Sequence, residues 1–246
     1  MKDIQASLNN FLTIDLTEIN RVALLNRVDT KYLLHTEEFM QLLPTLSEAY
    51  NVLAVNKRNI IPYQNLYFDT PDYENYLQHH NKNGNRYKVR YRQYTDTGVC
   101  FLESKYKTNT GRTQKKRLAV QEISKHLPEK NALLQLPHAS NSYKPMLYVN
   151  FYRITMADKA FSERATFDMF LEYATPQMAH LPLVILKKWV IVELKQDKIA
   201  SNSILLRHLK QQHIRPQTFS KYCVGMALTN TALKRNRFKA LLQKIV

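Results

Sequence analysis

The sequence predicts an α+β protein built on a closed antiparallel β-barrel with a polar, basic interior and flanked by α-helices. The first observation is a segment in which Arg86, Lys88, Arg90 and Arg92 occupy every second position. Because successive side chains of a strand point to opposite faces, these four cations share one face. The second observation is that the same alternation returns in several other segments. A sheet that packs on an ordinary core turns its charges to water, so repeated charged faces favour a closed sheet that encloses them.

The basic segment 86–94 admits two interpretations. Lys and Arg on an exposed hairpin edge discourage aggregation. Alternatively, the cations face inward and an anion compensates them, because like charges about 7 Å apart repel by about 2 kcal/mol at an effective dielectric constant of about 20. Repetition of the pattern favours the second interpretation. The other alternating segments are 27–33, 101–107, 115–117, 164–168 and 193–195.

The composition is that of a globular protein of 246 residues, 44% of them hydrophobic, and we expect one domain over residues 1–246. The net charge of +16 indicates a polyanionic partner such as nucleic acid, a phosphorylated metabolite, polyphosphate or an anionic membrane surface. Only Cys100 and Cys223 are present, which excludes a disulfide framework and a cysteine zinc site. The first residues lack an apolar signal core, and two lysines interrupt the most apolar run, 181–192. We therefore expect a cytoplasmic protein without a transmembrane segment.

The predicted helices follow from apolar spacing and capping residues. Near-helical spacing predicts an N-terminal helix within 6–26, in one or two pieces. Thr36, followed by two glutamates, begins a helix that ends near Ser47, and Asp72 begins a short helix. A last group of helices is predicted within 203–245.

Strands are predicted wherever the period-two pattern recurs. They span 27–34, 51–57, 62–69, 86–95, 99–107, 113–121, 145–157, 163–171 and 184–195. The sequence Thr95-Asp96-Thr97-Gly98 is a hairpin signal, so the strands on either side of it pair antiparallel and bring their charged faces together. The segment 122–143 has little periodicity and is predicted to be an excursion that contains a helix.

The sequence contains no glycine-rich phosphate-binding loop and no paired-histidine metalloprotease motif. Side chains must therefore hold any phosphate: Arg binds phosphate oxygens through two parallel hydrogen bonds, and Lys supplies a compact charge. Three acids, Glu103, Asp168 and Glu193, lie on otherwise basic faces. They form internal ion pairs or ligate a Mg²⁺ or Mn²⁺ that bridges phosphates, and the two uses are compatible. His79 and His80 mark a helix end or, alternatively, a metal site.

Two further patterns bear on the choice of partner. Readers of nucleic acid interleave cations with exposed aromatic residues, whereas Tyr87, Tyr91 and Tyr106 fall on the face opposite the cations. No specific nucleic acid is therefore expected. The basic run 234–239, followed by apolar positions within 241–245, is either a solvated helix or a helix that associates with a membrane or a partner protein.

A set of short motifs occurs in order along the chain. They are Arg27-x-Asp29-Thr30-Lys31-Tyr32, Tyr67-Phe68-Asp69-Thr70, Arg90-x-Arg92-x-x-Tyr94, Glu103-x-Lys105, Lys115-Lys116-Arg117, Tyr152-Arg153, Arg164-x-Thr166-x-Asp168, Glu193-x-Lys195 and Ser220-Lys221-Tyr222. Over about residues 20–230 this set resembles the catalytic domain of the vacuolar transporter chaperone (VTC) complex. That domain is the polyphosphate polymerase branch of the triphosphate tunnel metalloenzymes, or CYTH-like superfamily. The Glu-x-Glu-x-Lys signature of the adenylate-cyclase and thiamine-triphosphatase branch reads Arg27-x-Asp29-x-Lys31 here, which disfavours that branch.

The resemblance implies an antiparallel triphosphate tunnel with flanking helices and names its functional residues. The expected phosphate-binding cations are Lys31, Arg90, Arg92, Lys105, Lys115, Arg117, Arg153, Arg164 and Lys221. Of these, the expected catalytic residues are Lys31, Arg90, Arg92, Lys105 and Lys221. Glu193 is the expected ligand of the metal cofactor, Mn²⁺ or Mg²⁺.

The function that the resemblance implies is transfer of the γ-phosphoryl group of ATP to phosphate or polyphosphate, with ATP, triphosphate and polyphosphate as binding partners. Such a transfer needs mainly alignment and charge neutralisation, so it requires no nucleophilic side chain. Two alternatives stay open. One is hydrolysis of tripolyphosphate or a nucleoside triphosphate in the same tunnel. The other is non-catalytic binding of polyphosphate or nucleic acid.

Overall fold

The computed structural model describes residues 1–22, 28–129, 134–196 and 203–246, and its chain forms two compact units that interleave in sequence. Unit 1 consists of Met1–Ile61, Tyr152–Phe170 and Leu186–Phe219, and unit 2 of Pro62–Phe151, Leu171–Ile185 and Ser220–Val246. Two long strands, β8 (Lys144–Asp158) and β9 (Glu163–Ala174), contribute residues to both units. Each unit combines helices with mainly antiparallel strands, so the predicted α+β class is confirmed.

Unit 1 is built on β2, β11, β9 and β8, hydrogen-bonded in that order, with β3 paired to β8 and β1 paired to β3. The pairs β11–β2, β11–β9 and β3–β8 are antiparallel, whereas β1–β3 is parallel. The bounds are Val28–His35 for β2, Trp189–Gln196 for β11, Tyr50–Leu53 for β3 and Thr13–Ile14 for β1.

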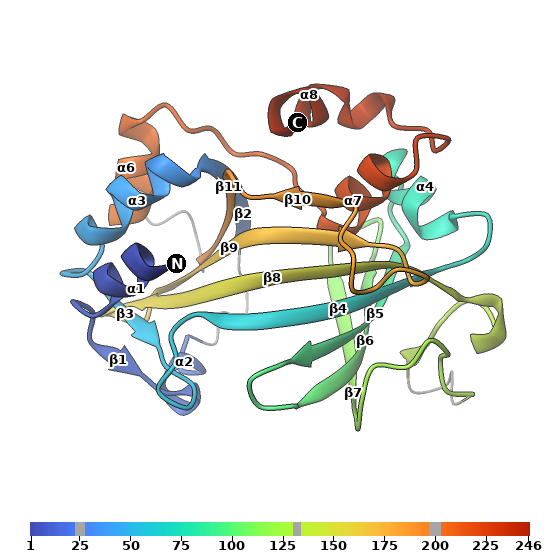
Figure 1. The fold of residues 1–246 in the computed structure, drawn as a ribbon, viewed down its shortest axis with the longest axis horizontal. Coiled ribbons are helices and arrows are strands. Elements are labelled where there is room, and N and C mark those ends of the chain that lie inside the picture. The colour runs from blue at the N-terminus through green and yellow to red at the C-terminus, as the bar shows by residue number, and fades with distance from the viewer. Residues whose placement is uncertain (23–27, 130–133, 197–202) are drawn as a thin grey trace. The chain divides into compact units, whose positions relative to one another are not determined.

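Three helices of unit 1, α1 (Lys2–Leu8), α3 (Thr36–Thr45) and α6 (Ile204–Gln211), pack on the apolar face of these strands. Figure 1 shows them on the same side of β9 and β11. In α3, Phe39, Leu42 and Leu43 recur at helical spacing and are fully buried, because that spacing places all three on the face turned to the sheet. The apolar face of unit 1 is therefore covered, and its charged residues lie on the other face.

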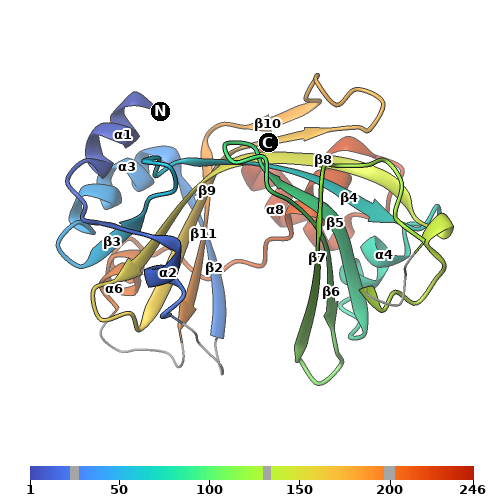
Figure 2. The ribbon, with the colours of Figure 1, turned by 90° about the horizontal axis from the view of Figure 1, so that it is seen from below.

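Unit 2 is built on β4 (Ile61–Asp69), β5 (Arg86–Tyr94), β6 (Cys100–Lys107) and β7 (Thr113–Val120), paired antiparallel in that order (Figure 2). The predicted hairpin between β5 and β6 is confirmed. Its turn closes when the Gly98 N–H donates to the Tyr94 carbonyl at 2.9 Å, and Gly98 has a φ of 70°, which a residue without Cβ adopts readily. β8 joins β4, where the Asn65 amide donates to the Val149 carbonyl at 2.9 Å.

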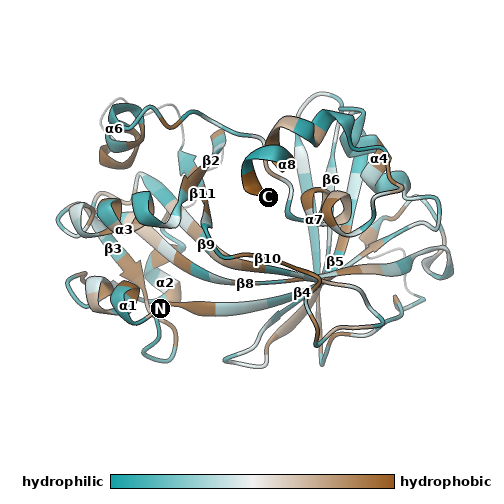
Figure 3. Ribbon diagram, turned by 45° about the horizontal axis from the view of Figure 1, so that its top comes forward, coloured by the Kyte–Doolittle hydropathy of each residue, from teal (hydrophilic) through white to brown (hydrophobic). Residues whose placement is uncertain are grey.

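One hydrophobic cluster of unit 2, which we call the unit 2 core, lies on one face of this sheet. Its members from β4, β5 and β6 are Leu66, Phe68, Val89, Tyr91, Cys100 and Leu102, and Leu127, Leu134 and Tyr143 of the excursion cover them. Figure 3 shows that the strands carry both hydrophobic and hydrophilic residues, as the alternation predicts. The helices of this unit are α4 (Glu74–His80), α7 (Lys221–Thr229) and α8 (Lys239–Ile245). His79 and His80 form the last turn of α4, so their interpretation as a helix end is confirmed.

Some predicted elements differ from the structure. Within 6–26 the chain forms β1 and the short helix α2 (Leu16–Ile19), because Asp15 caps α2 with a hydrogen bond from the Glu18 N–H at 2.8 Å and thereby separates it from α1. Arg27 lies outside the described residues. Within 122–143, the described part contains a 3-10 helix, η1 (Ser140–Ser142).

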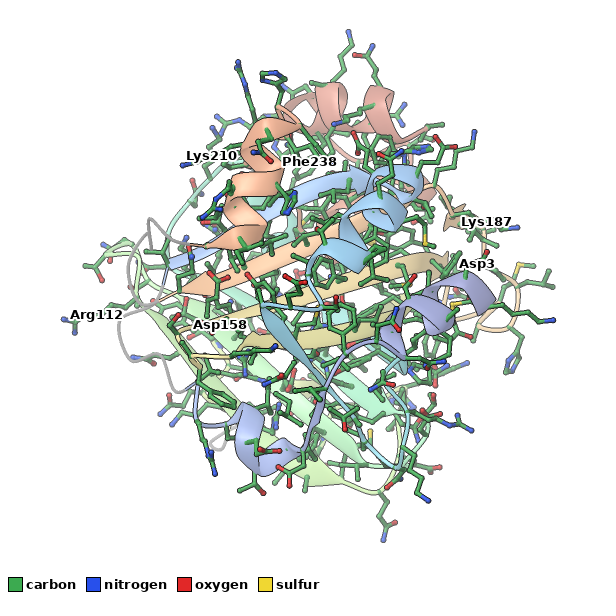
Figure 4. The ribbon with its side chains drawn as sticks, turned by 90° about the vertical axis from the view of Figure 1, so that its left-hand side faces the viewer. Asp3, Arg112, Asp158, Lys187, Lys210 and Phe238 are labelled. Atoms are coloured by element: carbon green, nitrogen blue, oxygen red, sulfur yellow. The ribbon has the colours of Figure 1, made fainter. Side chains whose placement is uncertain are left out.

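The predicted strand 184–195 is two strands, β10 (Val184–Leu186) and β11. The break comes at Lys187 and Lys188, whose carbonyls accept hydrogen bonds from the Thr36 side chain at 3.1 Å and the Thr36 N–H at 2.8 Å. The bond to the Lys188 carbonyl continues the pairing of β11 with β2, so the turn at Lys187 and Lys188 is held against the start of α3. Figure 4 shows Lys187 extending away from the ribbon at this turn.

Hydrogen bonds do not close the predicted barrel among the described residues, because the strand order begins at β2 and ends at β7. Both cysteines are buried, and both are free, in agreement with the exclusion of a disulfide framework. Across the ranges that the structure describes, no helix is long and apolar enough to span a membrane.

Candidate functional site

The face of the β4–β7 sheet opposite the unit 2 core is the basic face. Residues directly across from one another form rows over β5, β6 and β7: Arg86 and Lys107; Lys88, Lys105 and Lys115; Arg90, Glu103 and Arg117. Like charges placed opposite one another destabilise a sheet, and Glu103 is the one acid in these rows. The basic face therefore carries a large excess of positive charge that its own strands do not neutralise.

Glu103 is the centre of an ion cluster on this face. Its Oε2 accepts from Arg90 Nη2 at 2.8 Å and from Arg90 Nε at 3.0 Å. Its Oε1 lies 2.9 Å from Arg117 Nη2 and 2.7 Å from Lys115 Nζ. Arg92 Nε is 3.7 Å from Oε2. The ion-pair interpretation of Glu103 is confirmed, and we call these five residues the Glu103 cluster.

The Glu103 cluster is electrostatically unbalanced. Four cations surround one carboxylate whose side chain is only 3% exposed, so the cluster carries a net charge of about +3 when all its members are ionised. Burial by itself raises the pKa of Glu103, but attraction to Arg90, Arg92 and Lys115 outweighs burial, and the pKa lies well below its ordinary value. Glu103 is thus a carboxylate that stays ionised.

The pKa of Lys115 is lowered, whereas the pKa of the cation in an ordinary ion pair is raised. Burial lowers its pKa, and repulsion from Arg117 and Arg92 adds to burial, so that attraction to Glu103 is overcome and the pKa of Lys115 falls to about 8. An anion bound beside Lys115 would reverse this balance. The cluster is therefore short of negative charge.

Polar and aromatic side chains hold the two central arginines. Arg90 Nη1 donates to the Tyr67 hydroxyl at 2.8 Å, and Arg92 Nε donates to Asn65 Oδ1 at 3.2 Å. The Arg92 guanidinium also lies 5.4 Å from the ring centroid of Tyr63. These contacts come from β4, the strand beside β5, and they fix both guanidinium groups on the basic face.

The first turn of α7 supplies two further contacts within unit 2. Lys221 Nζ lies 4.8 Å from the centre of the Phe151 ring, which itself stacks on Tyr63 at 5.1 Å. Lys88 Nζ donates to the Ser220 hydroxyl at 3.1 Å. Lys105 stands across from Lys88 and has an exposed side chain.

Unit 1 has a charged face of its own, of mixed sign. In register across β2, β11 and β9 stand Lys31, Glu193 and Thr166, then Asp29, Lys195 and Arg164. Lys195 Nζ lies 3.5 Å from Glu193 Oε1 and 3.4 Å from Asp29 Oδ2. Lys31 Nζ donates to the Phe219 carbonyl at 3.1 Å. Here acids and cations alternate, which contrasts with the basic face of unit 2.

Arg153 and Asp168 form a two-pronged ion pair in unit 1. Arg153 Nε lies 2.5 Å from Asp168 Oδ1, and Nη2 lies 2.8 Å from Oδ2. The Asp168 side chain is 1% exposed and that of Arg153 is 15% exposed. The ion-pair interpretation of Asp168 is confirmed. A buried carboxylate of this kind depends on its cation partner for stability.

The residues available for a metal are few. No group of three or more His, Cys, Asp or Glu able to hold a metal ion occurs among the described residues. Glu193 and Asp29 share Lys195, so they form no cage of protein ligands. Mg²⁺ is commonly held by one or two carboxylates together with phosphate oxygens and water. Glu193 fits a metal that is bound together with a phosphate ligand.

The predicted site residues fall into both units. Arg90, Arg92, Lys115 and Arg117 meet at Glu103 in unit 2, with Lys105 in the adjacent row and Lys221 on α7. Lys31, Arg153, Arg164 and Glu193 belong to unit 1. Their roles in binding phosphate and metal stay predictions.

Several residues at the site are absent from the expected phosphate-binding set, and Lys88 is one of them although the alternation places it on the basic face. It follows the same period-two spacing as Arg90 and Arg92. No local pattern marks Asn65. Tyr67, Ser220 and Tyr222 lie in the motifs Tyr67-Phe68-Asp69-Thr70 and Ser220-Lys221-Tyr222, but the sequence assigns them no role, because their contacts with the basic face or its helix come from long-range pairing.

Comparison with known proteins decides the family. The VTC domain model matches residues 26–230. This chain belongs to the VTC domain family. The search among curated proteins found no match for it.

The VTC domain also has solved structural neighbours. A Hippeastrum protein described as an adenylyl cyclase candidate with a dominant triphosphatase activity aligns with a TM-score of 0.54 and 14% identity, over 82% of this chain and 95% of that chain. A Vibrio parahaemolyticus protein described as an adenylate cyclase candidate aligns with a TM-score of 0.47 and 12% identity, over 82% and 97%. At such identities the Hippeastrum protein shows a shared fold and nothing more.

Proposed function

We propose that this VTC domain binds triphosphates on its basic face and transfers the γ-phosphoryl group of ATP to phosphate or polyphosphate. The observation that carries the proposal is the Glu103 cluster, in which four cations share one buried carboxylate. Such a cluster gains most from a ligand with several negative charges. Membership of the VTC family supports the same class of ligand. The sequence resembles the catalytic domain of the VTC complex, which is a polyphosphate polymerase.

The proposed transfer requires alignment more than side-chain chemistry. An acceptor phosphate oxygen forms a bond to the γ-phosphorus, the bond from that phosphorus to the β–γ bridging oxygen breaks, and ADP leaves with the electron pair. Arg90 and Arg92, each fixed by a hydrogen bond to β4, would hold phosphate oxygens in line and neutralise charge. Lys115 and Lys221 would add compact charge, and Lys31, Lys105, Arg117, Arg153 and Arg164 complete the proposed set.

We place the proposed Mn²⁺ or Mg²⁺ at Glu193, together with phosphate oxygens of the substrate. When bound, the metal would neutralise charge on those oxygens. The contribution of this chain is a carboxylate held 3.5 Å from Lys195, which orients it on the unit 1 strands. The tunnel predicted from the sequence stays a prediction, and the fold shared with the Hippeastrum protein supports it.

Hydrolysis is the second candidate function. Water would replace phosphate as the acceptor while the same cations hold the triphosphate. The triphosphatase activity stated for the Hippeastrum protein favours this candidate. Because both reactions use one binding site, the acceptor alone separates them.

The decisive experiment follows label from ATP carrying labelled γ-phosphate, incubated with the purified chain and Mn²⁺. Label in acid-stable polymer supports the proposed transfer, whereas label in free phosphate alone supports hydrolysis. Binding of triphosphate with no label in either product would overturn both and leave a polyphosphate-binding protein. Arg112→Gln serves as the control variant, because Arg112 is exposed in the β6–β7 turn and extends away from the ribbon (Figure 4). It removes one charge without touching the Glu103 cluster.

A further inference from the structure

Asp69, at the end of β4, is a buried carboxylate that the proposed chemistry does not use. It has no exposed surface, and no cation of the described chain forms an ion pair with it. The N–H groups of Thr70 and Asn75 donate to Oδ1 at 2.9 and 2.8 Å. The Tyr76 N–H donates to Oδ2 at 3.0 Å, so Asp69 holds the start of α4. Burying a carboxylate without a cation partner costs free energy, so Asp69 depends on the hydrogen bonds that it accepts.

The fourth donor to Asp69 is Tyr222, which lies in the first turn of α7. The Tyr222 hydroxyl donates to Asp69 Oδ2 at 2.7 Å, and the side chain is 2% exposed. The Tyr222 ring stacks on Tyr67 with centroids 5.2 Å apart and an interplanar angle of 18°. Tyr67 in turn accepts from Arg90. A continuous chain of contacts therefore joins Asp69 to the Glu103 cluster.

The same helical turn carries Lys221, and its neighbour Ser220 contacts Lys88. The Ser220 hydroxyl accepts from the Cys223 N–H at 3.3 Å, which caps α7, and from Lys88 at 3.1 Å. Further along α7, Gly225 allows a close approach, because a Cβ there would lie 2.3 Å from the Tyr173 ring. The helix therefore rests directly on the strands of unit 2 and is pinned at its first turn by Tyr222.

We propose that Asp69 and Tyr222 are positioning residues: they fix the first turn of α7 and so hold the Lys221 ammonium where it can bind triphosphate on the basic face. The inference rests on the proposed function for its ligand. Neither residue touches phosphate. Tyr222 acts through Lys221, because the two residues are adjacent in the first turn of α7.

The test measures the dissociation constant for inorganic triphosphate with the full chain by calorimetry. Tyr222→Phe removes one hydroxyl and keeps the ring that stacks on Tyr67, and we expect it to weaken binding about fivefold. In a Lys221→Ala background, Tyr222→Phe should have no further effect, because the residue through which it acts is gone. Hydrogen exchange of the Cys223 and Val224 amides, read without ligand, should be faster in Tyr222→Phe.

Tyr91→Phe is the matched control. Tyr91 is 3% exposed on the apolar face, and its hydroxyl donates to the His126 carbonyl at 2.9 Å, so this variant also loses one buried hydroxyl contact. It should bind triphosphate as the wild type does, even if its melting temperature falls. A purely structural role predicts equal affinities in Tyr222→Phe and Tyr91→Phe.

Three results would overturn the inference: wild-type affinity in Tyr222→Phe, wild-type affinity in Lys221→Ala, or an undiminished effect of Tyr222→Phe in the Lys221→Ala background. Failure of the wild-type chain to bind triphosphate would instead overturn the proposed function and the ligand named here. Unchanged amide exchange at the first turn of α7 would refute the positioning role whatever the ligand.

Discussion

Glu103 Oε1 and Lys115 Nζ lie 2.7 Å apart, yet the pKa values of both side chains lie below their ordinary values. An isolated ion pair would lower the pKa of the acid and raise that of the base. The difference arises because partial burial, with repulsion from Arg117 and Arg92 added to it, lowers the pKa of Lys115 by more than attraction to the shared Glu103 carboxylate raises it. This imbalance gives a pH dependence that can be measured.

We expect the affinity for inorganic triphosphate to fall as the pH rises through about 8, where Lys115 loses its proton. Lys115→Met should lose this component. Without ligand, the folded chain binds fewer protons than the unfolded chain between about pH 8 and the ordinary lysine value of 10.5, so Lys115 makes the free energy of unfolding rise with pH in that window. Calorimetry and melting curves of both proteins between pH 7 and 10.5 measure the two effects. Parallel pH profiles for the wild type and Lys115→Met would contradict the cluster electrostatics.

Removing Arg92 should weaken ligand binding more than it weakens the fold. Arg92 is 3.7 Å from Glu103, which keeps three closer cations, so Arg92→Gln should lower stability by about 1 kcal/mol or less. Triphosphate affinity should fall about tenfold, because a charge-assisted contact to phosphate is lost. Arg112→Gln makes the same charge change in the exposed turn and should leave the affinity within twofold. Equal losses in the two variants would indicate a diffuse electrostatic effect.

Inorganic triphosphate should raise the melting temperature more than an equal concentration of monophosphate. A chain of phosphates reaches cations of several rows at once, whereas a single phosphate satisfies one or two. The measurement is a thermal melt at fixed ionic strength with each anion in turn, with sulfate as the control for charge. Identical shifts with all three anions would point to nonspecific surface binding.

Glu193→Gln separates metal ligation from ion pairing. If Glu193 ligates Mn²⁺, the variant should lose metal-dependent turnover and bind Mn²⁺ at least tenfold more weakly in the presence of triphosphate, while metal-free triphosphate binding survives. Electron paramagnetic resonance of free Mn²⁺ gives the affinity independently of activity. Asp29→Asn is the matched control, because Asp29 also contacts Lys195. A destabilised Glu193→Gln protein with an unaltered Mn²⁺ titration would leave Glu193 as an ion-pair partner only.

Asp168→Asn should destabilise the fold by about 3 kcal/mol or more, because it leaves the Arg153 guanidinium partly buried without its two-pronged partner. Chemical denaturation gives the change in the free energy of unfolding. A joint Arg153→Met and Asp168→Leu replacement should recover part of the loss, since no charge is then left unpaired. If Asp168→Asn is as stable as the wild type, the pair contributes little.

The sequence by itself determined which residues share a face. Period-two spacing placed Arg90, Arg92, Lys115 and Arg117 on the charged faces of their strands, because side-chain direction in a strand depends only on position along it. It also placed the β5–β6 hairpin through its turn residues. The tertiary structure decided the register, which brought all four cations to Glu103 and not merely to the same sheet.

Only the tertiary structure could show how Asp69 meets Tyr222, which is 153 positions away in the chain. Such a contact depends on where α7 packs, and that depends on the close approach at Gly225 and on burial of the whole helix. The turn at Lys187 and Lys188 likewise makes long-range contacts, because the carbonyls there accept hydrogen bonds from Thr36, which is far away in the sequence. Local patterns fix direction and periodicity, whereas long-range hydrogen bonds are set by packing that no short segment encodes.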